Sequence, residues 1–419
     1  MARSSTILIP LALAALALGG AALAQERPAN PEAARPRRLP PPPAGARSVE
    51  VVNADAPVFL APRAGAPRRG TLAAGARFPI LRRVAGDGCS TRSWVEIDEG
   101  HFVCERHLRF HRGAPAGRSQ PVVPEGARLP HDYAFVAYDG ARTFVHPRDY
   151  FRDEYYSALG EGFGLVVDGH ERYGGMSFAR TRRGLYVDAD ALRPARGSDF
   201  AGVLLGPGDA LDLAWVVRRG ARVHARRGGP VERRAGLREV VHVRTVERGW
   251  AELGDGTFMR ARDLARAELQ APPEELPEGS TWIDVDVATQ ILVFYRGETP
   301  LFATLVSTGR DRPTHRTPEG LHRVWVKLAF SDMDNLERDD LERNYAIERV
   351  PWVQYFEGAN GLHAAFWHDE FGRRKSHGCV NLAPADARRV FELSEPALPP
   401  GWTAIFPRPD EPTTYVRVR

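Results

Sequence analysis

The chain has 419 residues, too many for one hydrophobic core, so we expect two to four domains. Hydrophobic residues make up 43% and charged residues 26%, which indicates a mostly globular protein. The formal net charge is only +4, and no basic run is interleaved with aromatic residues, so nucleic acid is excluded as an expected partner.

Residues 1–24 have the order of a secretory signal peptide. Arg3 precedes an apolar stretch over residues 7–18, and small residues follow up to Ala24, after which we expect cleavage. A retained N-terminal anchor is the alternative, but the apolar stretch is shorter than the about 20 residues that span a bilayer. We expect secretion across the inner membrane, a periplasmic or wall-associated location, and no stable membrane insertion after cleavage. The proline-rich residues 25–46 are expected to form an extended linker.

A weak internal repeat follows between residues 47 and 270. Three stretches begin with an aromatic residue that is followed six residues later by glycine, eight later by an aromatic residue and fourteen later by leucine. They begin at Trp94, Phe178 and Trp250. The spacing predicts a short hairpin whose turn needs the glycine, followed by a closing turn held by the leucine.

These endings resemble those of bacterial SH3-like modules, which are small β-barrels of cell-wall proteins. The resemblance implies three all-β modules, at residues 47–112, 130–195 and 211–268. The middle copy diverges most and carries a polar, aromatic insertion around residues 149–156. The modules are expected either to bind a glycan or wall peptide or to act only as spacers.

The last third of the chain has a different pattern. Residues 271–280, with three prolines and three glutamates, are expected to form a second linker. Apolar residues then alternate or cluster in three predicted strands, at 282–287, 290–295 and 301–306. A helix is predicted to begin at Pro384. We therefore expect a β-rich domain with a short helix over residues 281–407, a C-terminal tail over 408–419, and a mainly β protein overall.

Three cysteines are present, and two of them lie close together. A bridge between Cys89 and Cys104 would close a loop of about 15 residues inside the first predicted module, a contribution of roughly 3 kcal/mol. Cys379 would then remain unpaired. A leftover thiol in an exported protein is either reactive or incidental, and its surroundings decide which.

Cys379 lies in the run Ser376-His377-Gly378-Cys379-Val380-Asn381, and His363 precedes it by sixteen residues. A nearby imidazole or helix N-terminus can lower the pKa of a thiol and favour the nucleophilic thiolate. Glycine lets the backbone approach a substrate closely, and the amides of Gly378 and Cys379 could point at a developing oxyanion. This combination of residues suits acyl transfer through a thiol.

The same run, with the upstream His363, resembles the signature of the L,D-transpeptidase, or YkuD-like, catalytic domain. Residues 307–309, 317–320 and 352–361 also resemble parts of that domain, and the resemblance covers about residues 280–407. It implies a β-sandwich or barrel with Cys379 as nucleophile and His363 as proton donor and acceptor. It also implies that neither a metal nor another cofactor is needed. Six further residues are expected to shape the site or contact the substrate. Ser376, His377 and Gly378 have the first role, and Asn381, Trp367 and Tyr355 have the second. Asn381 is one variant of the motif's last position.

The resemblance implies a reaction on peptidoglycan stem peptides. A tetrapeptide stem would lose its terminal D-Ala, and the diaminopimelate carbonyl would be held as a thioester. An amine on another stem or on a protein would then accept the acyl group. With water as acceptor, the same enzyme would be an L,D-carboxypeptidase or hydrolase.

Other interpretations remain open at this point. The protein could be a non-catalytic wall-binding protein, or His363, His368, His377 and Cys379 could hold zinc. His368 also competes with His363 for the role of base. Residues 331–349 are long, acidic and unlike the family pattern, and are expected to form a lid or side loop. His315 and His322 are expected on surface or strand positions without a role.

Overall fold

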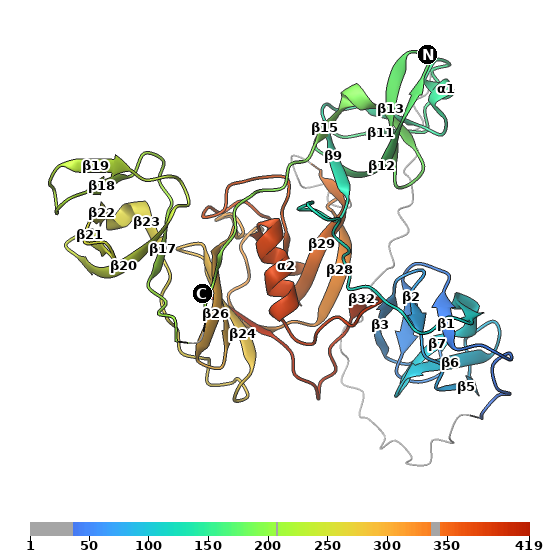
Figure 1. The fold of residues 1–419 in the computed structure, drawn as a ribbon. Helices are drawn as coiled ribbons and strands as arrows, with labels where there is room; N and C mark the ends of the chain where they lie inside the picture. The colour runs from blue at the N-terminus through green and yellow to red at the C-terminus, as the bar shows by residue number, and fades with distance from the viewer. Residues whose placement is uncertain (1–36, 207, 337–343) are drawn as a thin grey trace.

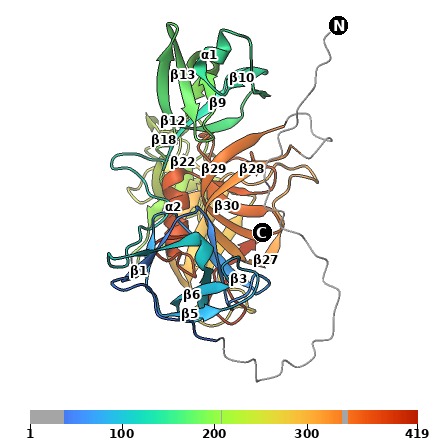
Figure 2. The same ribbon diagram turned by 90° about the vertical axis from the view of Figure 1, so that its right-hand side faces the viewer.

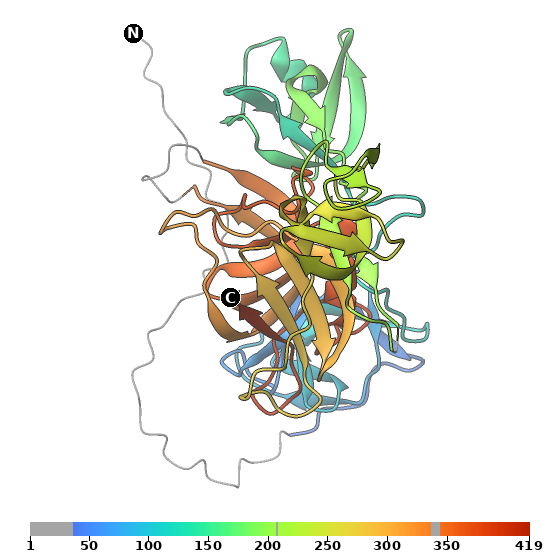
Figure 3. The ribbon, with the colours of Figure 1, turned by 90° about the vertical axis from the view of Figure 1, so that its left-hand side faces the viewer.

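The computed structural model describes residues 37–206, 208–336 and 344–419, and the predicted signal peptide lies outside them. The described chain is mainly β and consists of a central domain with three smaller modules around it (Figure 1). Two further views place the three modules on different sides of the central domain (Figure 2 and Figure 3). None of the helices in the described ranges is long and apolar enough to cross a membrane.

The first module covers residues 48–111. Val49, Val58 and Val95 are fully buried in its core. Cys89 and Cys104, the two cysteines expected to pair, are joined by a disulfide. The strands are β1 (Ser48–Val51), β2 (Ala56–Phe59), β3 (Arg68–Leu72), β4 (Arg77–Phe78), β5 (Arg82–Ala85), β6 (Ser93–Asp98), β7 (His101–Cys104) and β8 (Leu108–His111), with the 3-10 helix η1 (Glu105–His107) before β8.

The second and third modules cover residues 132–194 and 213–266 and are also antiparallel. The elements of the second module are β9 (Asp132–Val136), β10 (Ala141–Phe144), α1 (Pro147–Tyr150), β11 (Ser157–Leu159), β12 (Gly164–Tyr173), β13 (Met176–Thr181), β14 (Tyr186–Asp188), η2 (Ala189–Ala191) and β15 (Leu192–Pro194). Those of the third are β17 (Leu213–Val216), β18 (Arg222–His224), β19 (Val231–Arg234), β20 (Val240–Glu247), β21 (Trp250–Leu253), β22 (Phe258–Arg260), η3 (Ala261–Asp263) and β23 (Leu264–Arg266).

The repeated spacing in the sequence has the same structure in each module. The first aromatic residue lies in a strand, the second lies in the next strand, and a 3-10 helix then leads to a last strand that begins with the leucine. The turn glycine has a positive φ that suits residues without a side chain. These glycines are Gly100 (φ +70°), Gly184 (φ +76°) and Gly256 (φ +83°). The predicted hairpins and closing turns are therefore present, while a likeness to SH3 modules stays a prediction.

The central domain has two sheets. The first has the order β16-β26-β25-β24-β33-β27, and β16 (Val203–Leu204) is contributed by the segment between the second and third modules. Its other strands are β24 (Thr281–Asp286), β25 (Ile291–Arg296), β26 (Thr299–Leu305), β27 (Gly320–Arg323) and β33 (Tyr415–Val418). In the second sheet, neighbours pair in the order β31-β30-β29-β28-β32. These strands are β28 (Val326–Asp334), β29 (Ala346–Glu357), β30 (Asn360–Ala364), β31 (Val380–Leu382) and β32 (Trp402–Ile405).

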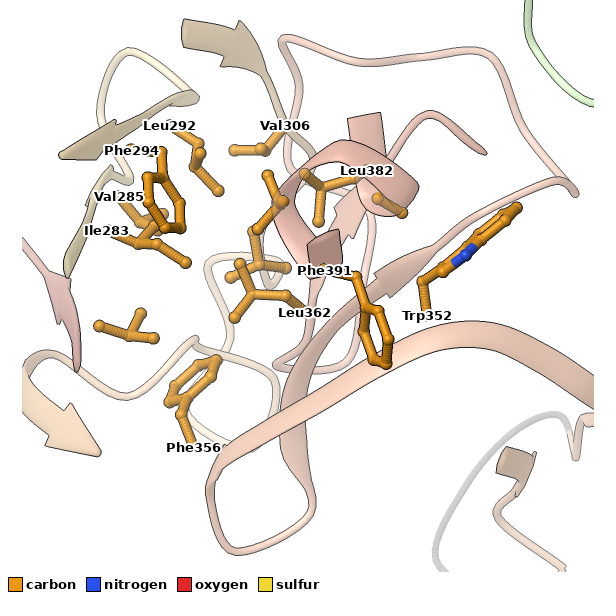
Figure 4. Close-up of a cluster of buried hydrophobic side chains, with 14 of the residues drawn as sticks. Ile283, Val285, Leu292, Phe294, Val306, Trp352, Phe356, Leu362, Leu382 and Phe391 are labelled. Carbon is orange, nitrogen blue, oxygen red and sulfur yellow. The ribbon is translucent and has the colours of Figure 1, made fainter. Parts of the chain in front are cut away.

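The two sheets and the helix α2 (Pro384–Leu393) share one buried core, to which Phe294, Leu362 and Phe391 contribute (Figure 4). The domain is thus a β-sandwich with a short helix, as expected. At the end of α2 the ammonium group of the fully buried Lys327 donates hydrogen bonds to the carbonyl oxygens of Phe391 (2.8 Å), Ser394 (2.6 Å) and Pro396 (3.0 Å). A cation at this position satisfies carbonyls that a helix end leaves unpaired.

Two expectations for the central domain are corrected. Residues 408–419 are not simply a tail, because β33 lies between β24 and β27 and buries Val416 and Val418. The pairing of β33 with β24 joins residues more than a hundred positions apart, so local sequence signals do not indicate it. Residues 331–349 form no separate lid where they are described. They mostly extend the hairpin of β28 and β29, and residues 337–343 lie outside the described ranges.

Backbone pairing also joins the modules to the central domain. Strand β3 of the first module pairs with β32, and Trp402 of β32 enters the core of that module. Strand β12 of the second module meets β29 at the pair Gly164 and Ile347. The first and second modules are therefore attached through sheet edges as well as through linkers.

Candidate functional site

Parallel pairing of β30 with β31 brings together residues that are far apart in the sequence. Leu362 lies opposite Val380, and His363 lies opposite Asn381. Because strand side chains alternate between faces, His363 and Asn381 point to one face of the sheet. Cys379 directly precedes β31 and, by the same register, lies beside Gly361 on that face.

Cys379 is the one free cysteine of the described chain and is half-buried. Its Sγ is 3.7 Å from the carbonyl oxygen of Ala359. Burial raises the pKa of the thiol, and a hydrogen bond from the Gly361 backbone opposes this only in part. The sequence suggested a lowered pKa, but desolvation of the anion outweighs the neighbouring groups here. The resting thiol is therefore protonated, and a base must remove its proton.

His363 has the properties of such a base. Its side chain is buried, and Nδ1 donates to the carbonyl oxygen of Ala364 over 3.0 Å. This hydrogen bond places the proton on Nδ1 and leaves a lone pair on Nε2. Burial lowers the pKa of His363 to about 4, with a smaller contribution from His368, so the ring is neutral at neutral pH. The indole of Trp367 packs beside it, with ring centroids 5.7 Å apart.

Ser376 holds the turn that presents the thiol. Its hydroxyl donates to the carbonyl oxygen of Cys379 over 2.5 Å and accepts from the Gly378 amide over 3.1 Å. Gly378 has a φ of +130°, at which a side chain would strain the backbone, and a Cβ there would lie 2.2 Å from Oδ1 of Asn360. This N–H is directed at the Ser376 hydroxyl, and the expected use of the Gly378 amide for an oxyanion stays a prediction.

His377 does not lie with His363. It is exposed, and its ring contacts His315 (centroids 4.4 Å apart) and Tyr345 (5.6 Å). His315 was expected on a surface or strand position without a role, but it is 5% exposed and packs against this motif residue. Among the described residues, no three histidine, cysteine or acidic side chains form a group that could hold a metal ion.

The side chains of Asn381 and His368 form a hydrogen bond with each other. The amide of Asn381 lies 3.0 Å from Nε2 of His368, and Nδ1 of His368 accepts from the Glu370 amide over 3.3 Å. Both ring nitrogens of His368 thus have partners, which leaves His363 as the better base. Asn381 is 3% exposed and its backbone pairs with Ser307. It was expected to contact substrate, but its burial suits a supporting position.

Tyr355 on β29 borders the thiol. Burial raises the pKa of Tyr355 to about 12, and the thiolate form of Cys379 would raise it further. The phenol oxygen lies 3.1 Å from the hydroxyl of Ser331, and the ring stacks on Trp325. Tyr355 is half-buried, so its ring can form one wall of a substrate site.

Residues 307–309 lie against the motif, as their resemblance to the family implies. The carbonyl oxygen of Thr308 accepts from the Ser376 amide, and the Gly309 amide donates to the hydroxyl of Thr317. Gln290, which the sequence gave no reason to select, is buried and holds Thr308 through both atoms of its amide, at 2.9 Å and 2.6 Å. A glutamine in a turn carries no signal of this kind before the fold is known.

Comparison with known proteins identifies a family for the last third of the chain. Residues 280–405 match the family model of the L,D-transpeptidase catalytic domain, YkuD. A search of curated proteins found no match. Similar solved structures include a mutant L,D-transpeptidase of Enterococcus faecium, at 22% identity over 33% of this chain and 50% of that one, with a TM-score of 0.25.

Two more similar structures are the catalytic domain of the E. faecium enzyme and L,D-transpeptidase 3 of Mycobacterium tuberculosis with a faropenem-derived adduct. The first has 24% identity over 34% of this chain and 98% of that one, with a TM-score of 0.26. The second has 17% identity over 33% and 60%, with a TM-score of 0.27. The match thus spans half of the chain in the structure of the E. faecium mutant. By the match to the family model, residues 280–405 are an L,D-transpeptidase catalytic domain of the YkuD family.

Proposed function

We propose that the protein is a cysteine acyltransferase that acts on peptidoglycan stem peptides, with Cys379 as the nucleophile and His363 as its base. The observation that carries the proposal is the state of His363. This buried, neutral imidazole keeps the lone pair of Nε2 available on the face of the sheet that presents a protonated thiol. A thiol with a raised pKa needs such a partner to become a nucleophile.

In the first half of the reaction, Nε2 of His363 takes the proton from Sγ of Cys379 while Sγ attacks the diaminopimelate carbonyl of a tetrapeptide stem. The carbon–nitrogen bond to the terminal D-Ala breaks, and His363 returns the proton to the departing amine. The enzyme then holds the acyl group as a thioester. We assign the amide of Cys379, rather than that of Gly378, as the oxyanion donor.

In the second half, an acceptor amine attacks the thioester carbon and gives a proton to His363. The new amide forms, the bond to sulfur breaks, and the proton returns to Cys379. Water in place of the amine would release a tripeptide, as in an L,D-carboxypeptidase. We favour the amine because the matched domain belongs to a transferase family. We also propose a location outside the cytoplasm, where peptidoglycan lies.

The test uses the chain from residue 25 onward, incubated with disaccharide-tetrapeptide muropeptides and followed by mass spectrometry. Dimers joined between two diaminopimelates are expected from a transferase, and tripeptides alone would identify a hydrolase. Cys379→Ala should abolish both products, whereas His242→Gln, an exposed position on the third module, should behave as the wild type. Equal turnover by Cys379→Ala and the wild type would refute the proposal.

A chelator and a thiol alkylator separate the remaining interpretations. Loss of activity with an alkylator but not with a chelator is expected for the proposed thiol enzyme. The reverse pattern would favour the zinc hypothesis. A protein that yields no product at all but sediments with purified cell walls would be a binding protein.

A further inference from the structure

The second module carries an unusual surface. Every phenylalanine, tyrosine or tryptophan that is exposed among the described residues lies in this module. Their exposed fractions run from 41% to 52%, which leaves about half of the surface of each residue in solvent. We name four of them, which lie just after α1 or at the end of β12, the aromatic surface: Phe151, Tyr155, Tyr156 and Tyr173. Exposed aromatic groups gathered in one place mark interaction sites more often than single exposed residues do.

Neighbouring side chains fix the orientation of these rings. The ring of Phe151 contacts Tyr150 (centroids 5.3 Å apart) and Tyr173 (5.9 Å), and Tyr173 also contacts His146 (6.0 Å). Phe151 rests on the hairpin turn between β12 and β13, where a Cβ at Gly174 would come within 2.4 Å of the ring. The rings are thus held in place before any partner binds, which reduces the entropy lost on binding.

The insertion that carries these rings is itself well held. Helix α1 begins with a capping box, in which Nδ1 of His146 accepts from the Arg148 amide and the carboxylate of Asp149 accepts from the His146 amide. The guanidinium of Arg142 lies 4.6 Å from the ring centre of Tyr155 and also pairs with Asp153. The insertion therefore presents a defined surface.

The aromatic surface is far from the thiol. Gly164, at one end of β12, pairs with Ile347 of the central domain, whereas Tyr173 ends the same strand. A strand of ten residues spans roughly 30 Å, so the surface lies about that distance from the pair of Gly164 and Ile347, where the module meets the central domain. Figure 1 shows α1 and β13 at the end of the second module that points away from the central domain. The surface is a separate site.

The chemistry of the surface selects an uncharged, hydroxyl-rich partner. Three of the four rings are tyrosines, which offer an apolar face and a hydroxyl donor together. Residues 138–156 contain three arginines and four acidic residues, so a polyanion gains no attraction. Sugar pyranose rings have one apolar face of C–H groups and a rim of hydroxyls that match such tyrosines. We propose that the aromatic surface of the second module binds the pyranose rings of a glycan strand.

The test uses the chain from residue 25 onward and a hexamer of N-acetylglucosamine, with calorimetry as the readout. Wild type is expected to bind, and the double variant Phe151→Ala/Tyr173→Ala should bind at least about tenfold more weakly. A matched control, Val231→Ala/Val246→Ala, removes two exposed side chains from the third module and should bind as the wild type. Circular dichroism checks that the variants are folded.

Three results would overturn the proposal. The first is that the wild type does not bind the hexamer at millimolar concentration. The second is that the double variant binds it as tightly as the wild type does. The third is that the double variant keeps glycan binding but loses self-association or binding to lipid vesicles. Turnover of soluble muropeptides should be the same in the double variant and in the wild type. Because glycan binding and turnover are measured separately, failure of this proposal is distinguishable from failure of the proposed thiol chemistry.

Discussion

Replacement of Gly70 by alanine is expected to destabilise the first module and the central domain together. Gly70 lies on β3, opposite Ile405 of β32, at the seam where the two units share a sheet. A Cβ at this position would be 2.1 Å from the carbonyl oxygen of Ala404 and 2.8 Å from the ring of Trp402. Real Cβ contacts are not found under 3.0 Å, so the two strands must separate.

The magnitude follows from what this separation disrupts. Overpacking at a tight contact costs about 1–3 kcal/mol, and each strained ladder hydrogen bond adds about 1 kcal/mol. Trp402, 5% exposed in the intact seam, would also lose contacts in the core of the first module. We therefore expect Gly70→Ala to lower the free energy of unfolding by about 2–4 kcal/mol.

Gly65 provides a matched control in the same module. A Cβ there meets no atom within 4 Å, so Gly65→Ala should change stability by less than about 1 kcal/mol. The assay is urea unfolding followed by tryptophan fluorescence, with acylation of Cys379 as a second readout for the central domain. Unfolding curves for Gly70→Ala and Gly65→Ala that agree within about 0.5 kcal/mol would refute the shared-sheet reasoning.

Three further predictions concern buried groups. Lys327→Met should lower the free energy of unfolding by about 2–3 kcal/mol, because three buried carbonyl oxygens lose their donor. Burial lowers the folded pKa of Lys327 to about 7 from its ordinary 10.5, so the unfolded chain binds more protons between these values. The free energy of unfolding of the wild type should therefore rise with pH from about 7 to 10.5. Urea titrations of Lys327→Met should not show this rise. Replacing Cys89 and Cys104 by alanine should cost roughly 3 kcal/mol in the same assay, since a loop of 15 residues is released. His363→Ala should slow acylation of Cys379 by about 10²–10⁴-fold. In the wild type, the acylation rate should fall only as the pH approaches 4. A pH–rate profile with its midpoint near 6.5 would contradict a buried, neutral imidazole.

Features that depend on neighbours in the sequence could be predicted. The disulfide joins cysteines 15 residues apart, and the hairpins follow from a glycine at a fixed place in each repeat. The alternation of β24 and the proline at the start of α2 identified a strand and a helix in their observed places. The run around Cys379 indicated its chemistry because a thiol, a glycine and two histidines lie close along the chain.

Features that depend on distant partners could not be predicted. Three contacts join residues that are far apart in the sequence or have no shared pattern. They are the pairing of β33 with β24, the pairing of β3 with β32, and the hydrogen bonds between Gln290 and Thr308. The direction of the Gly378 amide follows from where the Ser376 hydroxyl lies in the folded turn. The pKa of Cys379 depends on desolvation, which only the packed domain sets.

The sequence by itself therefore determined which residues carry the proposed chemistry, because their type and spacing are written along one stretch of chain. Only the tertiary structure decided their state. It placed His363 on the same face of the sheet as the thiol by pairing two parallel strands, left its Nε2 open, and buried both groups enough to keep them neutral. Register and burial are properties of long-range packing, and no single segment of the sequence encodes them.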